Sequence, residues 1–419
     1  MTYFISLLGV ISHYYDYHII GFLVSKISGL FFPTDVNSNL AIIKTFILLY
    51  MSIALKPIGA IIFGRIGDLK GRQAVLKQSL MISGILSIII ACVPTYSTIG
   101  VFAAIILLIC RIGISTVASL GTDSIRLYVY ERLKRFPTLG NGIVGSTSVI
   151  GSGIASFSAL FFTNPELPNY FWRFSVGLGG GLALLLALIL YFYKHKLDND
   201  NYLKLEKSYQ DDSKKTLTKV IKDNLSLFLI TSVLLGCFGS IYSFNTIFWT
   251  TIHATELGNN EIIKYIPYGI TIYLVSTLLF CYLVDILKLK VLPIICSIVA
   301  IGFYVLLLNY IYDTDSHIKI YYCLMFALGG VVNPSVVLII QFLPITIRQR
   351  IFSLSHSIGS ITISHTNSII CISLCTYYES IKPAIIYAIV ILSTILCCSI
   401  YLYKRIILES KNLQKNTSN

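Results

Sequence analysis

The sequence predicts an all-α membrane protein with twelve transmembrane helices. Apolar residues make up 55% of the 419 positions and charged residues only 12%, whereas a soluble globular domain carries roughly 25% charged residues. A bilayer core needs about 20 mostly apolar residues per helix, and twelve stretches meet this requirement. They are too long and too evenly apolar to be strands of a transmembrane barrel.

The expected helices form two groups of six, on either side of one long polar interval rich in Lys and Asp. Their approximate spans are 3–25, 40–63, 74–94, 98–125, 137–162 and 172–193, then 225–250, 263–285, 289–311, 318–342, 350–377 and 381–404. We therefore expect an N-terminal six-helix bundle over 1–193, a linker over 194–224, a C-terminal six-helix bundle over 225–404 and a tail over 405–419.

Basic residues are concentrated on one side of the predicted membrane, so the net charge of +13 does not indicate a nucleic acid partner. With the amino terminus in the cytoplasm, most of the 32 Lys and Arg fall in cytoplasmic segments, and Lys56 and Arg111 are the two assigned to the helices themselves, away from their ends. The positive-inside rule then places both termini and the 194–224 linker in the cytoplasm. We expect a multi-pass protein of a bacterial cell inner membrane.

The sequence indicates neither a cleaved signal peptide nor a cysteine-based disulfide or metal site. The first helix has no basic n-region or small-residue cleavage site, so it does not resemble a cleaved signal peptide. The ten cysteines fall almost wholly inside predicted helices and form no C-x-x-C pair. We expect reduced, structural thiols, with no disulfide framework, metal site or cofactor.

The two groups of helices are related by a weak internal repeat, which is visible in the positions of charged residues. Asp68, with basic residues after it, is echoed by Asp285, and Arg135 before the fifth helix is echoed by Arg350 before the eleventh at nearly the same offset. Two parallel six-helix halves, related by an axis along the membrane normal, produce this pattern and carry a solute site between them.

One loop carries a recognisable motif. Between the second and third helices the chain reads Phe-Gly-Arg-Ile-Gly-Asp-Leu-Lys-Gly-Arg-Gln over 63–73, after Lys-Pro-Ile-Gly over 56–59. The loop resembles the G-x-x-x-D-[RK]-x-G-R-[RK] signature of the major facilitator superfamily. The residues before it resemble the metabolite–proton symporter branch, which includes proline/betaine carriers.

This resemblance implies a major facilitator fold of two pseudo-symmetric bundles and a cytoplasmic gate. Glycines suit the places where the chain turns tightly or where two helices approach closely, and Gly64 and Gly71 stand there. In the family, the loop's aspartate and arginine tie the domains together while the carrier is outward-open. The resemblance assigns that role to Asp68 and Arg72.

Further similarities are spread along the chain, but the fourth helix departs from the branch. The similarities are Tyr-Tyr-Asp-Tyr at 14–17, Arg111, Trp172-Arg173, and Pro344 with Arg348. Branch members commonly carry Gly-Gly-Glu in the fourth helix, where this chain has Ser-Leu-Gly at 119–121. Asp123 follows two positions later, and a two-residue shift turns a side chain by about 200° on a helix, so direct replacement is doubtful.

Ionisable residues at bilayer depth are functional candidates, because burying them costs a few kcal/mol. Asp16 lies near the middle of the first helix and is the leading proton-coupling candidate, with a structural hydrogen bond or ion pair as the alternative. Burial disfavours the charged form of a carboxyl, which suits cyclic loading and release of a proton. Asp123 is the next candidate.

The remaining polar residues in the membrane suggest a solute site. Arg111 and Lys56 either counter Asp16, bind a solute carboxylate or hold helices together, and the planar fork of Arg suits carboxylate recognition. The other candidate substrate-binding residues are Tyr14, Tyr15 and His18. His356, His365 and Asn367 give the eleventh helix a polar stripe, although each alone is more often a helix contact than a ligand.

We therefore expect a secondary active transporter, a proton-coupled symporter of a small organic solute such as proline or betaine, working by alternating access. Its expected partners are the solute, the proton and the lipid bilayer, and it is expected to act as a monomer. An enzyme is disfavoured because the chain has no paired carboxylates or H-E-x-x-H cluster. A non-transporting receptor or structural member of the same fold is the alternative.

Overall fold

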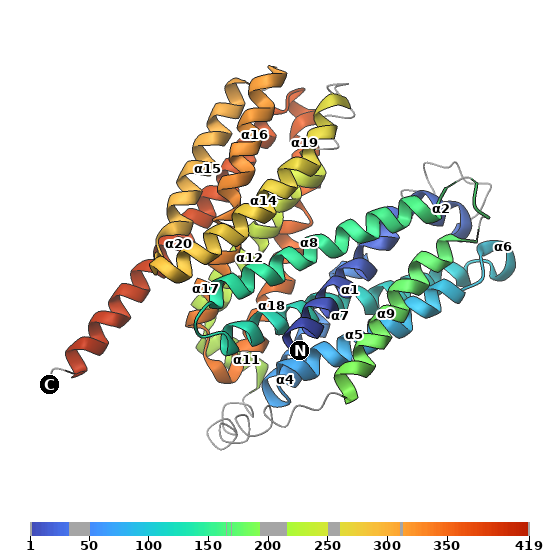
Figure 1. The fold of residues 1–419 in the computed structure, drawn as a ribbon, viewed down its shortest axis with the longest axis horizontal. Helices are drawn as coiled ribbons and strands as arrows, with labels where there is room; N and C mark the ends of the chain where they lie inside the picture. The colour runs from blue at the N-terminus through green and yellow to red at the C-terminus, as the bar shows by residue number, and fades with distance from the viewer. Residues whose placement is uncertain are drawn as a thin grey trace. The chain divides into compact units, whose positions relative to one another are not determined.

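The computed structural model describes residues 2–32, 51–164, 166–168, 170–192, 216–249, 260–310 and 313–417 (Figure 1). Nearly all of them are helical. The helices of the first half of the chain are α1 (Thr2–Phe22), α2 (Val24–Phe31), α4 (Lys56–Leu69), α5 (Arg72–Cys92), α6 (Tyr96–Ile99), α7 (Phe102–Arg132), α8 (Pro137–Phe162) and α9 (Trp172–Phe192).

The second half continues with the same architecture. Its elements are α11 (Leu217–Asp223), α12 (Leu225–Ser243), the π-helix η1 (Phe244–Phe248), α14 (Asn260–Leu287), α15 (Leu292–Asn309), α16 (Thr314–Gly329), α17 (Val332–Phe342), the 3-10 helix η2 (Ile345–Ile347), α18 (Arg348–Gly359), the π-helix η3 (Ser360–Ser364), α19 (Asn367–Tyr378) and α20 (Lys382–Thr417).

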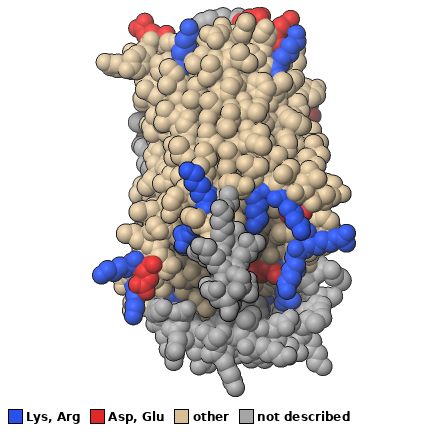
Figure 2. All heavy atoms as spheres, turned by 90° about the vertical axis from the view of Figure 1, so that its left-hand side faces the viewer, with Lys and Arg blue, Asp and Glu red and all other residues tan. Residues whose placement is uncertain are grey.

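Ten helices within the described ranges are long and apolar enough to cross a membrane. The 21-residue α1 is not among them, because its middle carries the ionisable residues His13, Asp16 and His18. The helix expected over 40–63 lies partly outside the described residues, as does most of the linker expected over 194–224. Figure 2 views the protein from the side on which α15 and α20 lie. The charged side chains of this face lie near its two ends, and an uncharged band lies between them.

The chain divides into two compact units. Unit 1 comprises 1–129, 144–223 and 344–357, and unit 2 comprises 130–143, 224–343 and 358–419. Each unit therefore contains most of one predicted half together with a short segment from the other half. The segment 344–357, which includes the start of α18, is the one that matters most for the candidate site.

In unit 1, α5 packs along α9, and α1 packs against both (Figure 1). Small residues allow α5 and α9 to come close, since a methyl group added to Gly84 would lie 2.9 Å from the carbonyl oxygen of Gly180. Helices in membranes commonly associate through such small-residue contacts. This packing fixes the rotation of α1 about its axis and hence the direction of its polar side chains.

Unit 2 repeats part of this pattern, with α15 packed along α20 and α12 packed against α20. By order along the chain, these helices correspond to α5, α9 and α1 of the first half. The tenth expected helix is interrupted where α16 ends at Gly329 and α17 begins at Val332, directly before the predicted break at Asn333-Pro334. The twelfth does not end at 404, because α20 continues to Thr417 through good helix formers such as Lys, Glu and Gln.

Candidate functional site

Asp68 lies in the last turn of α4, directly before the turn that leads into α5. Gly71 makes this turn with a φ of 90°, a conformation that favours glycine, and Arg72 then opens α5. Asp68 and Arg72 are both buried, at 6% and 3% exposure. A carboxylate buried to this degree needs several hydrogen-bond donors.

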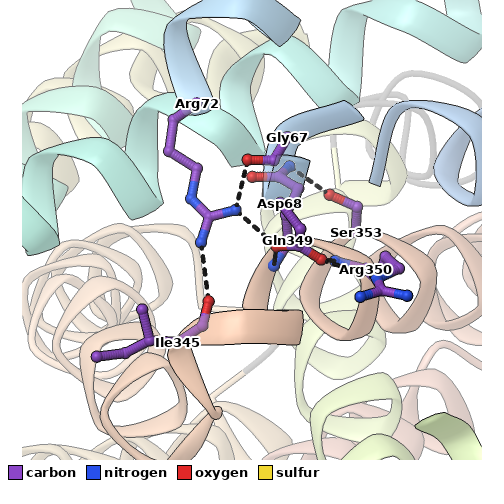
Figure 3. Close-up of polar contacts among 7 residues, drawn as sticks. All are labelled: Gly67, Asp68, Arg72, Ile345, Gln349, Arg350 and Ser353. Atoms are coloured by element: carbon purple, nitrogen blue, oxygen red, sulfur yellow. Dashed lines mark hydrogen bonds and ion pairs between the residues drawn. The ribbon is translucent and has the colours of Figure 1, made fainter. Parts of the chain in front are cut away.

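The Asp68 carboxylate has four donors, all within unit 1 (Figure 3). Oδ1 accepts from Nη1 of Arg72 at 2.8 Å and from the backbone N–H of Gln349 at 2.9 Å. Oδ2 accepts from Nε of Arg350 at 3.0 Å and from its backbone N–H at 3.2 Å. The carboxylate therefore caps the first turn of α18, where helix N–H groups have no intrahelical partner and favour an anion.

Arg72 extends this cluster. Besides Asp68, its Nη1 donates to the carbonyl oxygen of Gly67 at 3.1 Å, and its Nη2 donates to that of Ile345 at 3.5 Å. Glycines allow α18 to lie directly against α4: a methyl group on Gly64 would lie 3.0 Å from Cα of Arg350, and one on Gly67 would lie 2.6 Å from Cγ of Gln349. The four residues assigned to a gate, Gly64, Asp68, Gly71 and Arg72, thus surround one contact with the segment 344–357.

Asp285, in the last turns of α14, makes the corresponding contact in unit 2. Its Oδ1 accepts from the backbone N–H of Thr138 at 3.2 Å, and its Oδ2 accepts from that of Leu139 at 2.8 Å. The carboxylate thus caps the first turn of α8. The sequence echo between Asp68 and Asp285 therefore corresponds to two helix caps, each joining one half of the chain to a helix of the other.

A group of cations surrounds Tyr17 of α1, deeper in unit 1. The ammonium of Lys56 lies 4.8 Å from the centre of the Tyr17 ring and 3.4 Å from its hydroxyl. Arg111 of α7 lies 5.8 Å from the same ring and donates to the backbone carbonyls of Asp16 at 3.1 Å and Tyr17 at 2.9 Å. His18 lies within electrostatic range of both cations, and its ring contacts that of Tyr17. We refer to Lys56, Arg111, Tyr17 and His18 as the cation cluster.

The cation cluster carries more positive charge than its protein partners neutralise. Lys56 and Arg111 are 5% and 3% exposed. Within the described part of the chain, no carboxylate forms an ion pair with either of them, and Nε of Arg111 makes no hydrogen bond. Burying an unpaired cation is costly, so an anionic group from a ligand would stabilise this arrangement.

Asp16 points away from Lys56, toward α5 and α9. Its carboxyl faces Ser87 of α5, and it packs so tightly against Gly179 of α9 that an added methyl group would overlap Oδ1. Neither carboxyl oxygen makes a hydrogen bond of normal geometry with a described residue, although Arg111 lies within electrostatic range. The side chain is 1% exposed.

The two neighbouring tyrosines differ in environment. The Tyr15 hydroxyl donates to the carbonyl oxygen of Ser175 at 2.7 Å and hydrogen-bonds the Ser158 hydroxyl at 2.6 Å, so its polar group is used in packing against α8 and α9. Tyr14 lies near Ser148, Asp123 and Arg126, and its ring stacks on that of His18 with 6.0 Å between the ring centres. The structure therefore brings Arg111, Lys56 and His18 together and leaves Tyr15 outside the cation cluster.

Sequence reasoning missed two residues in the first helix. Tyr17 is the centre of the cation cluster, and its position one turn after Tyr14 was the available signal. His13 is fully buried, and its Nε2 hydrogen-bonds the hydroxyl of Ser79 at 2.8 Å. Its one-turn spacing from Asp16 and Tyr17 was visible, but the serine that binds it belongs to a distant part of the sequence.

The chain is distantly similar to proteins that are named as proline/betaine transporters. A protein of Staphylococcus aureus (strain COL) named "Putative proline/betaine transporter" is 27% identical over 250 residues, which is 54% of this chain and 52% of the relative. The proline/betaine transporter of Escherichia coli (strain K12) is 26% identical over 196 residues, covering 46% of this chain and 38% of the relative. The aligned region thus spans about half the length, or less, of these relatives.

Solved structures resemble the whole chain. The proton:xylose symporter XylE aligns with a TM-score of 0.71 at 15% identity, covering 96% of this chain and 94% of that one. FucP in the outward conformation aligns with a TM-score of 0.62 at 10% identity, covering 96% and 98%. These identities establish a shared fold and nothing finer.

The model of the Major Facilitator Superfamily matches residues 8–364, which include the Asp68 loop and the cation cluster. The predicted fold class is thereby confirmed: two bundles of six transmembrane helices, ten of which are seen as apolar spans in the described residues. The prediction that the chain is not an enzyme is confirmed by the same comparisons. The chain belongs to the Major Facilitator Superfamily.

Proposed function

We propose that this protein is a proton-coupled symporter of a small zwitterionic solute, such as proline or a betaine, and that the cation cluster binds the solute's carboxylate. The observation that carries the proposal is the buried charge of Lys56 and Arg111 around Tyr17, with which no carboxylate of the described residues forms an ion pair. An aromatic ring such as that of Tyr17 also attracts a quaternary or secondary ammonium. The names of the distant relatives support this class of solute.

Thermal unfolding of the purified protein tests the solute class, because a solute that binds only the folded state raises the unfolding temperature. Each solute is paired with a close analogue that lacks the carboxylate: proline with prolinamide, and glycine betaine with choline. We expect stabilisation by proline or glycine betaine and much less by its partner. Equal stabilisation by both members of each pair would refute carboxylate recognition.

A matched pair of variants locates the binding site. Lys56→Met keeps most of the side-chain volume and removes the charge, so it should abolish stabilisation by the carboxylate solute. Lys77→Met is the control, since Lys77 lies over the Tyr191 ring, away from the cation cluster. Uptake into liposomes then separates a carrier from a non-transporting receptor, because a receptor would bind the solute and accumulate none.

We further propose that the protein lies in a bacterial inner membrane as a monomer, with both termini in the cytoplasm. The concentration of Lys and Arg in the expected cytoplasmic segments supports this orientation. Reporter fusions at Asn199 and Asn259, both outside the described residues, should report opposite sides of the membrane. Reports from the same side would refute the six-plus-six topology.

A further inference from the structure

Another buried carboxylate of unit 1 contacts a histidine, at a place separate from the Asp68 contact. Oδ1 of Asp123 lies 2.8 Å from Nδ1 of His356. Asp123 belongs to α7, and His356 belongs to α18, two turns beyond the residues that contact Asp68. A buried acid and an imidazole are thus brought together from opposite halves of the sequence.

The two members of this pair differ in how far they are exposed at the protein surface. The Asp123 side chain is 1% exposed, and its second oxygen, Oδ2, makes no hydrogen bond with any described residue. The His356 side chain is 30% exposed. An imidazole can donate and accept a proton through its two nitrogens, so His356 offers a route between the aqueous phase and the buried carboxyl.

The surroundings supply few other titratable groups. From α1, Tyr14 lies within electrostatic range of Asp123, and its hydroxyl is near Ser148 of α8. On α7 itself, Arg126 follows one turn later and also lies near Tyr14. On α18, the Phe352 ring packs near the His356 ring at 6.5 Å, and Arg350 is engaged with Asp68. His356 is a titratable group that contacts Asp123 directly.

We propose that Asp123 and His356 form a proton-binding site of the carrier, in addition to Asp16. A proton from water binds Nε2 of His356, the proton on Nδ1 passes to Oδ1 of Asp123, and the imidazole is left neutral. Release runs through the same atoms in reverse. This inference rests on the proposed proton-coupled function and names the atoms that would hold the second proton.

Because His356 lies on α18, loss or gain of the proton would affect how α18 packs against α7. Losing the proton leaves a buried carboxylate whose Oδ2 has no hydrogen bond from a described residue, which favours hydration of that oxygen and hence separation of α18 from α7. The same helix is held at its first turn by Asp68. Proton occupancy would therefore bias the contact between the segment 344–357 and the first-half helices.

Infrared spectroscopy of the reconstituted protein tests the proton site without any solute. Protonated carboxyl groups absorb in a region free of other protein bands, so the pH titration of this absorption is compared among variants. We expect Asp123→Asn to lose one titrating carboxyl signal, and His356→Gln to shift its midpoint by at least one pH unit. His365→Gln, a histidine of the same expected helix outside the pair, should titrate as the wild type does.

Full retention of the titrating signal in Asp123→Asn, or a wild-type titration in His356→Gln, would show that the pair is a static helix contact. If Asp123→Asn does not fold, His356→Gln still decides the matter, since its partner carboxyl remains present. Because the measurement involves no solute, its failure is distinct from failure of the transport assay. A carrier that transports solute and lacks this signal would keep the proposed function and lose the second proton site.

Discussion

Among the described residues, no counter-charge binds the Asp16 carboxyl directly, and Arg111 donates to backbone carbonyls instead. If it couples transport to protons, Asp16→Asn mimics the permanently protonated state. We expect this variant to lose uphill accumulation in vesicles with an imposed pH gradient while retaining solute counterflow. Gradient-driven accumulation by Asp16→Asn would make Asp16 a structural residue of the α1, α5 and α9 contact.

Asp68 holds the first turn of α18 through two backbone N–H groups and two arginines. Asp68→Asn removes the charge and gives Arg72 and Arg350 a weaker acceptor. A charge-assisted hydrogen bond contributes about 1.5–3 kcal/mol, so protection of the Gln349 and Arg350 amides should fall roughly tenfold to a hundredfold. Hydrogen exchange with mass spectrometry measures this effect without a solute.

Transport measurements on the same variant, and a control variant, complete that experiment. The transport rate of Asp68→Asn should fall more than its solute affinity, because Asp68 lies outside the cation cluster. Asp313→Asn is a suitable control, since that carboxylate is exposed and accepts a hydrogen bond from the nearby Ser316 hydroxyl. Wild-type protection at 349–350 in Asp68→Asn would contradict the capping role.

At the scale of elements, the approach of α18 to α4 depends on the absence of a side chain at Gly64. In Gly64→Ala, the new methyl group would lie 3.0 Å from the Arg350 backbone, and such overpacking costs about 1–3 kcal/mol. We expect a lower unfolding temperature and faster amide exchange at 348–350. Gly181→Ala in α9 is the matched control, because no described heavy atom lies within 4 Å of its added methyl group.

The contrast between the Asp68 loop and the cation cluster shows which parts of the site could be predicted from sequence. The loop is short, so the glycines, Asp68 and Arg72 appear together in one motif, and their cationic and helix-end partners follow from general electrostatics. The identity of Gln349 as a backbone donor did not follow, because it depends on which helix packs against α4.

The cation cluster was only partly predictable for a geometric reason. Neighbouring residues on a helix point about 100° apart, so the membership of Tyr17 and the exclusion of Tyr15 depend on the rotation of α1. That rotation is set by contacts with α5 and α9, through residues such as Gly179. Hydrophobicity gave little help, since α1, unlike the other long helices of the described first half, has no stretch apolar enough to be identified as a membrane span.

At the scale of the whole molecule, the two repeated aspartates have the same structural role: each caps a helix that belongs to the other half of the chain. Asp68 ends the second helix of the first half and caps α18, whereas Asp285 ends the second helix of the second half and caps α8. The two caps lie in different units and share no residue. They differ in strength, because Asp68 also binds two arginines, and Asp285 accepts only backbone N–H groups among the described residues.

We therefore predict that Asp285→Asn deprotects the amides of Thr138 and Leu139 without affecting those of Gln349 and Arg350, and that Asp68→Asn does the reverse. The loss of protection should be smaller for Asp285→Asn, because no charged donor is left behind. Contributions from sites without shared partners add to within about 0.5 kcal/mol, so the double variant should show the sum of the two local effects. Hydrogen exchange in all four proteins measures this directly. Deprotection of both segments by either single substitution would show instead that the two caps open together, as one cooperative contact between the halves of the carrier.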